Sequence, residues 1–126
     1  MAITHIGRTT IYVDDQDRAK AFYADTLGFE PVMDMPMGDE GGSRWIEVRP
    51  PSGQTNVVIL LGGGDFPKPG GMNPSLFETD DIKATYDELS AKGVEFPTPP
   101  EFAAWGKWWA TFKDTEGNEF GLGQDG

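Results

Sequence analysis

The residues that could support acid–base, nucleophilic or metal chemistry are few in this chain of 126 residues. The chain contains no cysteine, which excludes thiol catalysis and disulfide bonds, and His5 is its only histidine. A catalytic triad needs partners around the histidine, and the sequence near His5 does not suggest them. Tyr23 and Tyr86 could transfer a proton only in a loose sense, because both fall on apolar faces of expected helices. The residue types therefore do not indicate a nucleophilic mechanism.

Aromatic residues are better represented, at 12% of the chain. Flat apolar side chains suit a pocket for a planar ligand, but they equally suit a protein core. Three methionines alternate along one expected strand and share one of its faces: Met33, Met35 and Met37. Trp108 and Trp109 are adjacent, so one must face the core and the other the opposite side, and the sequence leaves open which. The aromatic residues expected to contact a ligand are Trp45, Phe77, Trp105, Trp108 and Trp109.

Composition narrows the class of protein further. The formal net charge is −11, from 21 acidic and 10 basic residues, which disfavours nucleic-acid binding because phosphate contacts need a basic surface. No apolar run is long enough to span a membrane, and the start of the chain lacks a signal-peptide core. We therefore expect a cytoplasmic protein with no nucleic-acid partner and no membrane association; the absence of a cofactor is expected separately, from the ligand positions considered below.

Two segments repeat the same order of structural signals about 65 residues apart. Residues 76–96 predict a strand followed by an amphipathic helix and then a new strand. The pair Asp80-Asp81 supplies the N-cap of the helix, and Gly93 ends it. Residues 11–30 show the same order, with Asp14-Asp15 before the helix and Gly28 after it. The chain is thus predicted to be a tandem repeat, with each half forming one structural module.

Alternation and turn residues predict the remaining strands. The expected strands are 4–13, 29–37, 44–49 and 56–61 in the first half, and 75–79, 94–96, 108–113 and 118–123 in the second. The glycine- and proline-rich run between the halves reads as a linker. We therefore predict a single domain over 1–126, made of module one (4–62), a linker (63–72) and module two (73–124), each with the order β-α-β-β-β.

Three stretches resemble the vicinal oxygen chelate superfamily, which includes glyoxalase, extradiol dioxygenases and bleomycin-binding proteins. They are residues 13–29 (VDDQDRAKAFYADTLGF), 79–94 (TDDIKATYDELSAKGV) and 112–122 (FKDTEGNEFGL). The resemblance covers nearly the whole chain and implies an α+β fold in which two modules curl into half-barrels around a cavity. It also implies a homodimer.

The metal-dependent members of that superfamily carry four ligands, one on the first and one on the last strand of each module. The corresponding positions here hold Arg8, Pro74, an aliphatic residue within 57–61, and Gly121. None of these side chains is a common metal ligand, so the resemblance implies no metal site. Glu119 shares a strand face with Gly121, but one carboxylate does not make a site.

Arg8 stands in a ligand position that the resemblance turns toward the cavity. A buried guanidinium must be paired, so Arg8 either forms a salt bridge to Glu47 or Glu119 or waits for an anionic ligand. The expected ligand-binding set is Arg8, Trp45, Phe77, Trp105, Trp108, Trp109, Glu119 and Gly121, with no catalytic or metal-binding residue assigned.

The function expected from these observations is metal-independent binding and sequestration of an aromatic or antibiotic-like small molecule. The alternative is a lyase, isomerase or dioxygenase-like enzyme of the same superfamily with an atypical metal site. Neither the ligand nor the arrangement of a dimer can be read from the sequence, because a shared fold does not carry a shared ligand.

Overall fold

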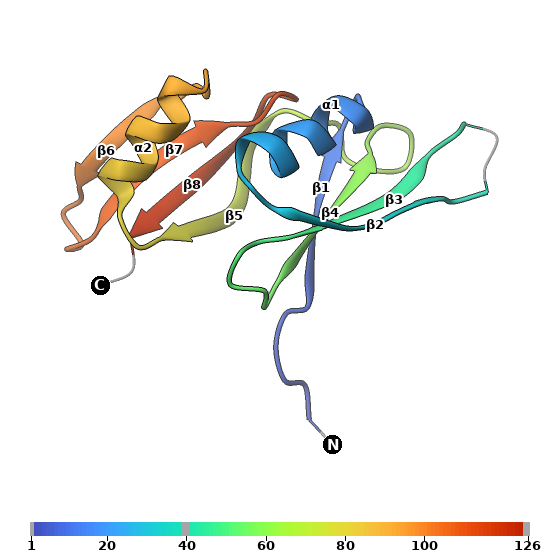
Figure 1. Ribbon diagram of the computed structural model, residues 1–126, viewed down its shortest axis with the longest axis horizontal. Coiled ribbons are helices and arrows are strands. Elements are labelled where there is room, and N and C mark those ends of the chain that lie inside the picture. The colour runs from blue at the N-terminus through green and yellow to red at the C-terminus, as the bar shows by residue number, and fades with distance from the viewer. Residues whose placement is uncertain (1, 39–40, 125–126) are drawn as a thin grey trace. The chain divides into compact units, whose positions relative to one another are not determined.

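The computed structural model describes residues 2–38 and 41–124 (Figure 1). The chain divides into two compact units, the first ending at Pro69 and the second beginning at Gly70. Each unit pairs one four-stranded sheet with one main helix, in the order β-α-β-β-β. The α+β fold with two repeated modules is therefore confirmed. No helix in the described part of the chain is long and apolar enough to cross a membrane.

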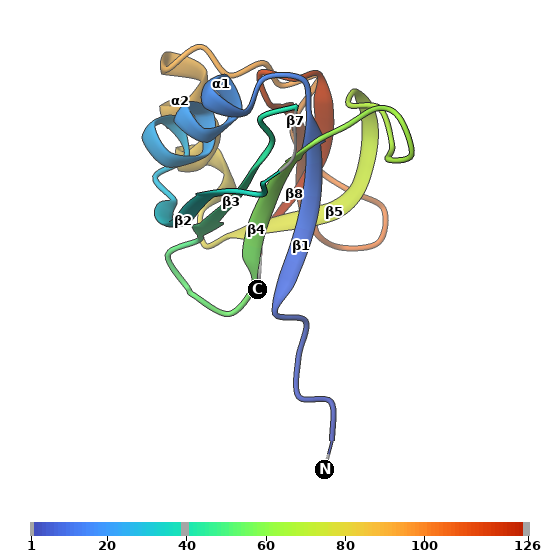
Figure 2. The ribbon, with the colours of Figure 1, turned by 90° about the vertical axis from the view of Figure 1, so that its right-hand side faces the viewer.

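The first unit contains a mixed sheet with the strand order β1-β4-β3-β2. Strands β1 and β4 run parallel and side by side (Figure 2), and the other neighbours are antiparallel. Strand β1 begins at Arg8, four residues later than the alternation predicted, while β3 and β4 match their predicted bounds. The elements are β1 (Arg8–Val13), α1 (Gln16–Ala21), a π-helical turn η1 (Phe22–Thr26), β2 (Glu30–Pro36), β3 (Arg44–Arg49) and β4 (Asn56–Leu61).

The helix of the first unit covers the sheet face that carries alternate aliphatic residues. Ile11, Ile46 and Ile59 are fully buried and lie in register across β1, β4 and β3. The helical segment contributes Ala19 and Tyr23, also fully buried, to the same core. Such close packing of aliphatic and aromatic groups is the main source of stability for an amphipathic helix on a sheet.

Both helices begin at the second member of an aspartate pair. The side chain of Asp15 accepts a hydrogen bond from the backbone N–H of Arg18 at 3.0 Å, and Asp81 accepts one from Ala84 at 3.1 Å. Each bond satisfies a donor that the first helical turn leaves free. The chain leaves each helix through a glycine with positive φ, Gly28 or Gly93, where other residues would be strained.

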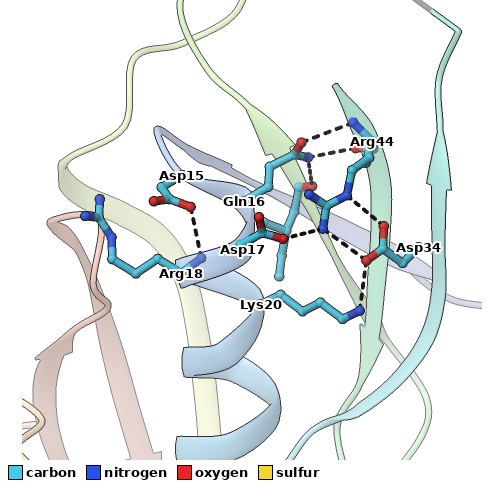
Figure 3. Close-up of polar contacts among 8 residues, drawn as sticks. Asp15, Gln16, Asp17, Arg18, Lys20, Asp34 and Arg44 are labelled. Carbon is cyan, nitrogen blue, oxygen red and sulfur yellow. Dashed lines mark hydrogen bonds and ion pairs between the residues drawn. The ribbon is translucent and has the colours of Figure 1, made fainter. Parts of the chain in front are cut away.

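A polar network ties α1 to β2 and β3 on the helix-covered side of the sheet (Figure 3). Arg44 donates to Asp34 from Nε at 2.9 Å and to Asp17 from Nη2 at 2.8 Å. Lys20 donates to Asp34 at 2.8 Å. The pKa of Asp34 is lowered from 3.8 to about 2, mainly by the hydrogen bonds from Arg44 and Lys20. Asp34 is thus the shared anion that links helix and sheet.

The Asp34→Asn variant is expected to lose about 1–2 kcal/mol of unfolding free energy at pH 7, a value reduced for partial solvent screening. Because the folded state lowers the pKa of Asp34, its contribution is complete above about pH 4 and is lost as the pH falls toward about 2. The gap between wild type and variant should therefore close over that range. Urea unfolding at several pH values measures it, with the exposed Asp65→Asn as control; a gap that persists at pH 2 would contradict the assignment.

The second unit repeats the arrangement with the strand order β5-β8-β7-β6, and its helix α2 contacts β6, β7 and β8 (Figure 1). The expected strand at 94–96 is wrong. The chain forms β6 later instead, through Pro99 and Pro100, and this is possible because β6 is an edge strand with a register irregularity. The elements are β5 (Gly71–Thr79), α2 (Ile82–Ala91), β6 (Thr98–Phe102), β7 (Trp108–Lys113) and β8 (Asn118–Gln124).

Strand β5 also starts earlier than predicted, at Gly71 rather than Ser75, so its first residues fall inside the expected linker. The turn before β8 explains this early start. Asp114 accepts hydrogen bonds from the backbone N–H groups of Glu116 and Asn118, and the Asn118 side chain accepts one from the N–H of Gly70 at 2.8 Å. Two buried side chains of the turn therefore fix the point where β5 begins beside β8.

Candidate ligand-binding surfaces

Each sheet has one face covered by its helix and an opposite face, called here the open face. In the first unit, Asp34 contacts α1 and pairs across the strands with Ile46, which places both on the helix-covered face. In the second unit, Lys83 of α2 places its Nζ 4.3 Å from the ring centre of Trp108. Because strand side chains alternate, the neighbouring residues Glu47 and Trp109 lie on the open faces.

Glu47 is the centre of a polar cluster on the open face of the first unit. Its Oε1 accepts hydrogen bonds from Nε of Arg8 at 3.0 Å and from the indole N–H of Trp45 at 3.1 Å. Its Oε2 accepts one from the side-chain amide of Asn56 at 2.6 Å. Burial alone would raise the pKa of Glu47, but the hydrogen bonds from Asn56, Trp45 and Arg8 outweigh it and lower the pKa. The carboxylate is therefore charged at neutral pH.

The predicted salt bridge of Arg8 exists, and of the two expected partners Arg8 pairs with Glu47. The burial is the reverse of the expectation, however. The Glu47 side chain is only 4% exposed, whereas that of Arg8 is 60% exposed. Arg8 comes from the edge strand β1, where solvent reaches its guanidinium, while Glu47 comes from the inner strand β3. The buried charge is thus the acid, and the base extends outward from it.

Methionines flank this cluster along β2. Met33 lies opposite Glu47 and Met35 lies opposite Trp45 in the antiparallel pairing of β2 and β3. Both side chains are exposed, at 42% and 57%. The open face of the first unit therefore places a polar cluster next to flexible apolar side chains, a combination suited to irregular apolar ligands.

Two tryptophans form the main feature on the open face of the second unit. The ring centres of Trp105 and Trp109 are 5.7 Å apart, with an angle of 49° between their planes. The indole N–H of Trp109 donates to Glu101 at 3.1 Å, which fixes the orientation of that ring. Trp105 lies in the loop before β7 and is 67% exposed. The pair thus presents an aromatic surface that the unit's own core does not use.

Two glycines next to Trp109 leave this open face without side chains at their positions. Gly123 is the cross-strand partner of Trp109, and a Cβ there would meet the Glu78 carboxylate at 3.2 Å. A Cβ on Gly121 would clash with the side chain of Leu76. The glycines therefore allow β5 side chains to lie across β8. Glu119 lies on this face as predicted, half-buried and opposite Lys113.

The remaining two predicted contacts lie on the helix-covered face. The ring of Phe77 packs against those of Phe112 at 5.7 Å and Phe120 at 5.2 Å, inside the core under α2. Trp108 lies under Lys83 and beside Phe102, so of the two adjacent tryptophans it is Trp109 that faces away from the helix. Strand alternation separates both residues from the Trp105–Trp109 pair, and neither belongs to the open face.

The four positions at which the resemblance predicts metal ligands do not supply a suitable donor set. Arg8 is a cation, Pro74 and Gly121 lack a donor side chain, and β4 offers only aliphatic residues from Val57 to Leu61. Within residues 2–38 and 41–124 no group of three or more His, Cys, Asp and Glu side chains could hold an ion. His5 is exposed before β1 and hydrogen-bonds Thr4. The residues present therefore do not fit a metal centre.

Comparison with known proteins yields one consistent family. Residues 4–122 match the model described as "Glyoxalase/Bleomycin resistance protein/Dioxygenase superfamily". The chain is 37% identical to "Uncharacterized protein YetH" of Bacillus subtilis (strain 168), over 94% of this chain and 96% of that protein.

Solved structures agree with this family. A superfamily member from Sphaerobacter thermophilus DSM 20745 is 38% identical with a TM-score of 0.89, and the match covers 98% of each chain. TnmS3, described as an antibiotic binding protein from Streptomyces sp. CB03234, is 35% identical with a TM-score of 0.85, covering 100% of this chain and 99% of that one.

Proposed function

The chain belongs to the glyoxalase/bleomycin resistance protein/dioxygenase superfamily, and we propose that within it the protein binds and sequesters a partly aromatic small molecule without a metal ion. The observation that carries the proposal is the Trp105–Trp109 pair, in which Trp105 is exposed and the half-buried Trp109 is oriented by its hydrogen bond to Glu101. A preorganised aromatic surface loses little conformational entropy when a flat ring stacks on it.

Similarity to an antibiotic-binding protein along the full chain supports the same proposal. The ligand class it suggests is antibiotic-like: planar, partly apolar and large enough to cover both indole rings. The first unit, taken by itself, has a second apolar surface with Trp45 and the exposed methionines Met33 and Met35. An enzymatic function of the lyase, isomerase or dioxygenase type would need a ligand set that Arg8, Pro74 and Gly121 do not provide.

The proposal is tested by binding measurements on protein treated with a chelator. We expect at least one member of a panel of planar aromatic antibiotics and polycyclic amides to quench tryptophan fluorescence saturably. The Kd should be the same before and after chelation, and added Zn²⁺, Ni²⁺, Fe²⁺ or Mn²⁺ should not change it, because the residues that the structure describes contain no donor cluster to hold these ions. Binding that disappears on chelation and returns with one of these ions would contradict the proposal.

A homodimer and a cytoplasmic location stay predictions. Light scattering, compared with the chain mass of 13.8 kDa, tests the first, and fractionation of the source cells tests the second.

A further inference from the structure

The charge distribution around Glu47 is unusual for a purely structural ion pair. A buried carboxylate loses its hydration, and an aliphatic residue at the same place would serve stability as well or better. Yet Glu47 is 3% exposed and is held by the donors of Arg8, Trp45 and Asn56. Its one charged partner among the described residues, Arg8, is mostly exposed, so the ion pair is not closed off from solvent. A buried carboxylate that holds an exposed guanidinium in one orientation leaves that guanidinium in place to bind a ligand.

The hydrogen bonds determine which part of the guanidinium is free to bind. Arg8 uses Nε to reach Glu47, and among the described residues its two terminal nitrogens have no hydrogen-bond partner. These terminal nitrogens form the planar fork that binds a carboxylate through two parallel hydrogen bonds. Because Arg8 and Trp45 donate to the same oxygen of Glu47, the fork and the indole are neighbours.

We infer that the open face of the first unit contains a subsite for an aryl carboxylate, with the carboxylate on the terminal nitrogens of Arg8 and the ring against Trp45. Glu47 fixes both groups through its Oε1. The subsite rests on the first unit alone and adds a ligand class that the proposed function leaves open. Related oxyanions such as sulfonates also present two acceptor oxygens to the fork and fall in the same class.

The net charge of −11 opposes the approach of any anion at long range. Discrimination in favour of a carboxylate must therefore come from the short-range fork of Arg8. If the fork binds the carboxylate, the protein should prefer a charged ligand over a neutral ligand of the same shape. This preference should disappear when the fork is removed. The same preference must survive when an equal charge is removed elsewhere in the chain.

The test compares 2-naphthoate with 2-naphthamide, which differ in charge but hardly in shape, by isothermal titration calorimetry on the full chain. Wild-type protein should bind the naphthoate about tenfold more tightly, the value of one charge-assisted hydrogen-bonded pair. Arg8→Gln should abolish the preference while changing the naphthamide Kd less than about twofold. Arg18→Gln, which removes one charge from the helix-covered side of the same unit, should retain it.

Arg8→Lys separates geometry from charge, because lysine keeps the charge but has no planar fork. We expect it to lose most of the preference. Full retention of the preference in Arg8→Lys would overturn the bidentate geometry. Equal affinities of wild type for the two probes, no naphthoate binding at millimolar concentration, or an undiminished preference in folded Arg8→Gln would each overturn the subsite. None of these results would touch the Trp105–Trp109 pair, so failure here is distinct from failure of the proposed function.

Discussion

Replacing Gln16 by alanine is expected to lower the unfolding free energy by about 2–4 kcal/mol, because the Gln16 side chain satisfies main-chain groups of two strands. Its Nε2 donates to the carbonyl oxygens of Arg44 at 2.7 Å and Ile59 at 2.9 Å, and its Oε1 accepts from the N–H of Arg44 at 3.1 Å (Figure 3). Gln16 is only 6% exposed, so water cannot easily replace these bonds in the variant.

The charge variant Gln16→Glu sharpens this prediction. At neutral pH it would place a carboxylate oxygen against two carbonyl oxygens, so its loss should exceed that of Gln16→Ala. Gln54→Ala, at an exposed glutamine of the same unit, is the matched control and should change stability by less than about 0.5 kcal/mol. Urea unfolding followed by circular dichroism measures all three. A Gln16→Ala protein as stable as the control would show that these bonds are not needed.

The Phe77→Ala variant is expected to lose about 2–4 kcal/mol of unfolding free energy, because Phe77 packs against Phe112 and Phe120 in the core of the second unit. The loss should fall in the lower part of the range for phenylalanine because Phe77 is not fully buried. Thermal or urea unfolding measures it. Phe102→Ala is the control, since Phe102 is 62% exposed and should cost less than about 1 kcal/mol.

The Phe77→Ala variant also tests whether Phe77 contacts a ligand, as the sequence suggests. If Phe77→Ala kept the wild-type stability but weakened binding of an aromatic ligand, Phe77 would belong to the binding surface and the packing described above would not be its main role.

The sequence predicts structure correctly where the interaction itself is local. Asp15 and Asp81 cap their helices through bonds to a residue three positions later, so the spacing of a few residues was sufficient. The sequence does not predict strand β6, because Pro99 and Pro100 argue against a strand unless it lies at an edge, and edge position depends on the whole sheet.

In the candidate site, too, local features are predictable from the sequence, whereas features that depend on the whole sheet are not. Alternation established that Trp108 and Trp109 face opposite ways, but only the position of Lys83 on α2 shows which one lies under the helix. The pairing of Arg8 with Glu47 was among the expected alternatives, whereas the greater burial of the acid follows from strand order. The sequence does carry a signal for Gln16, because it is a polar residue in the same inward helical stripe as Ala19 and Tyr23.

We propose that an aromatic ligand stacks on the Trp105–Trp109 pair, and the adjacent residues Trp108 and Trp109 offer the most direct test. The measurement is the Kd of one tight-binding planar aromatic antibiotic for Trp109→Ala and for Trp108→Ala, with folding of both checked by circular dichroism. An aromatic stack adds roughly 0.5–1.5 kcal/mol beyond area burial, so Trp109→Ala should weaken binding by about threefold to tenfold. Trp108→Ala should lower stability and leave the Kd nearly unchanged. Weakened binding in Trp108→Ala together with an unchanged Kd in Trp109→Ala would show that the ligand does not stack on Trp109.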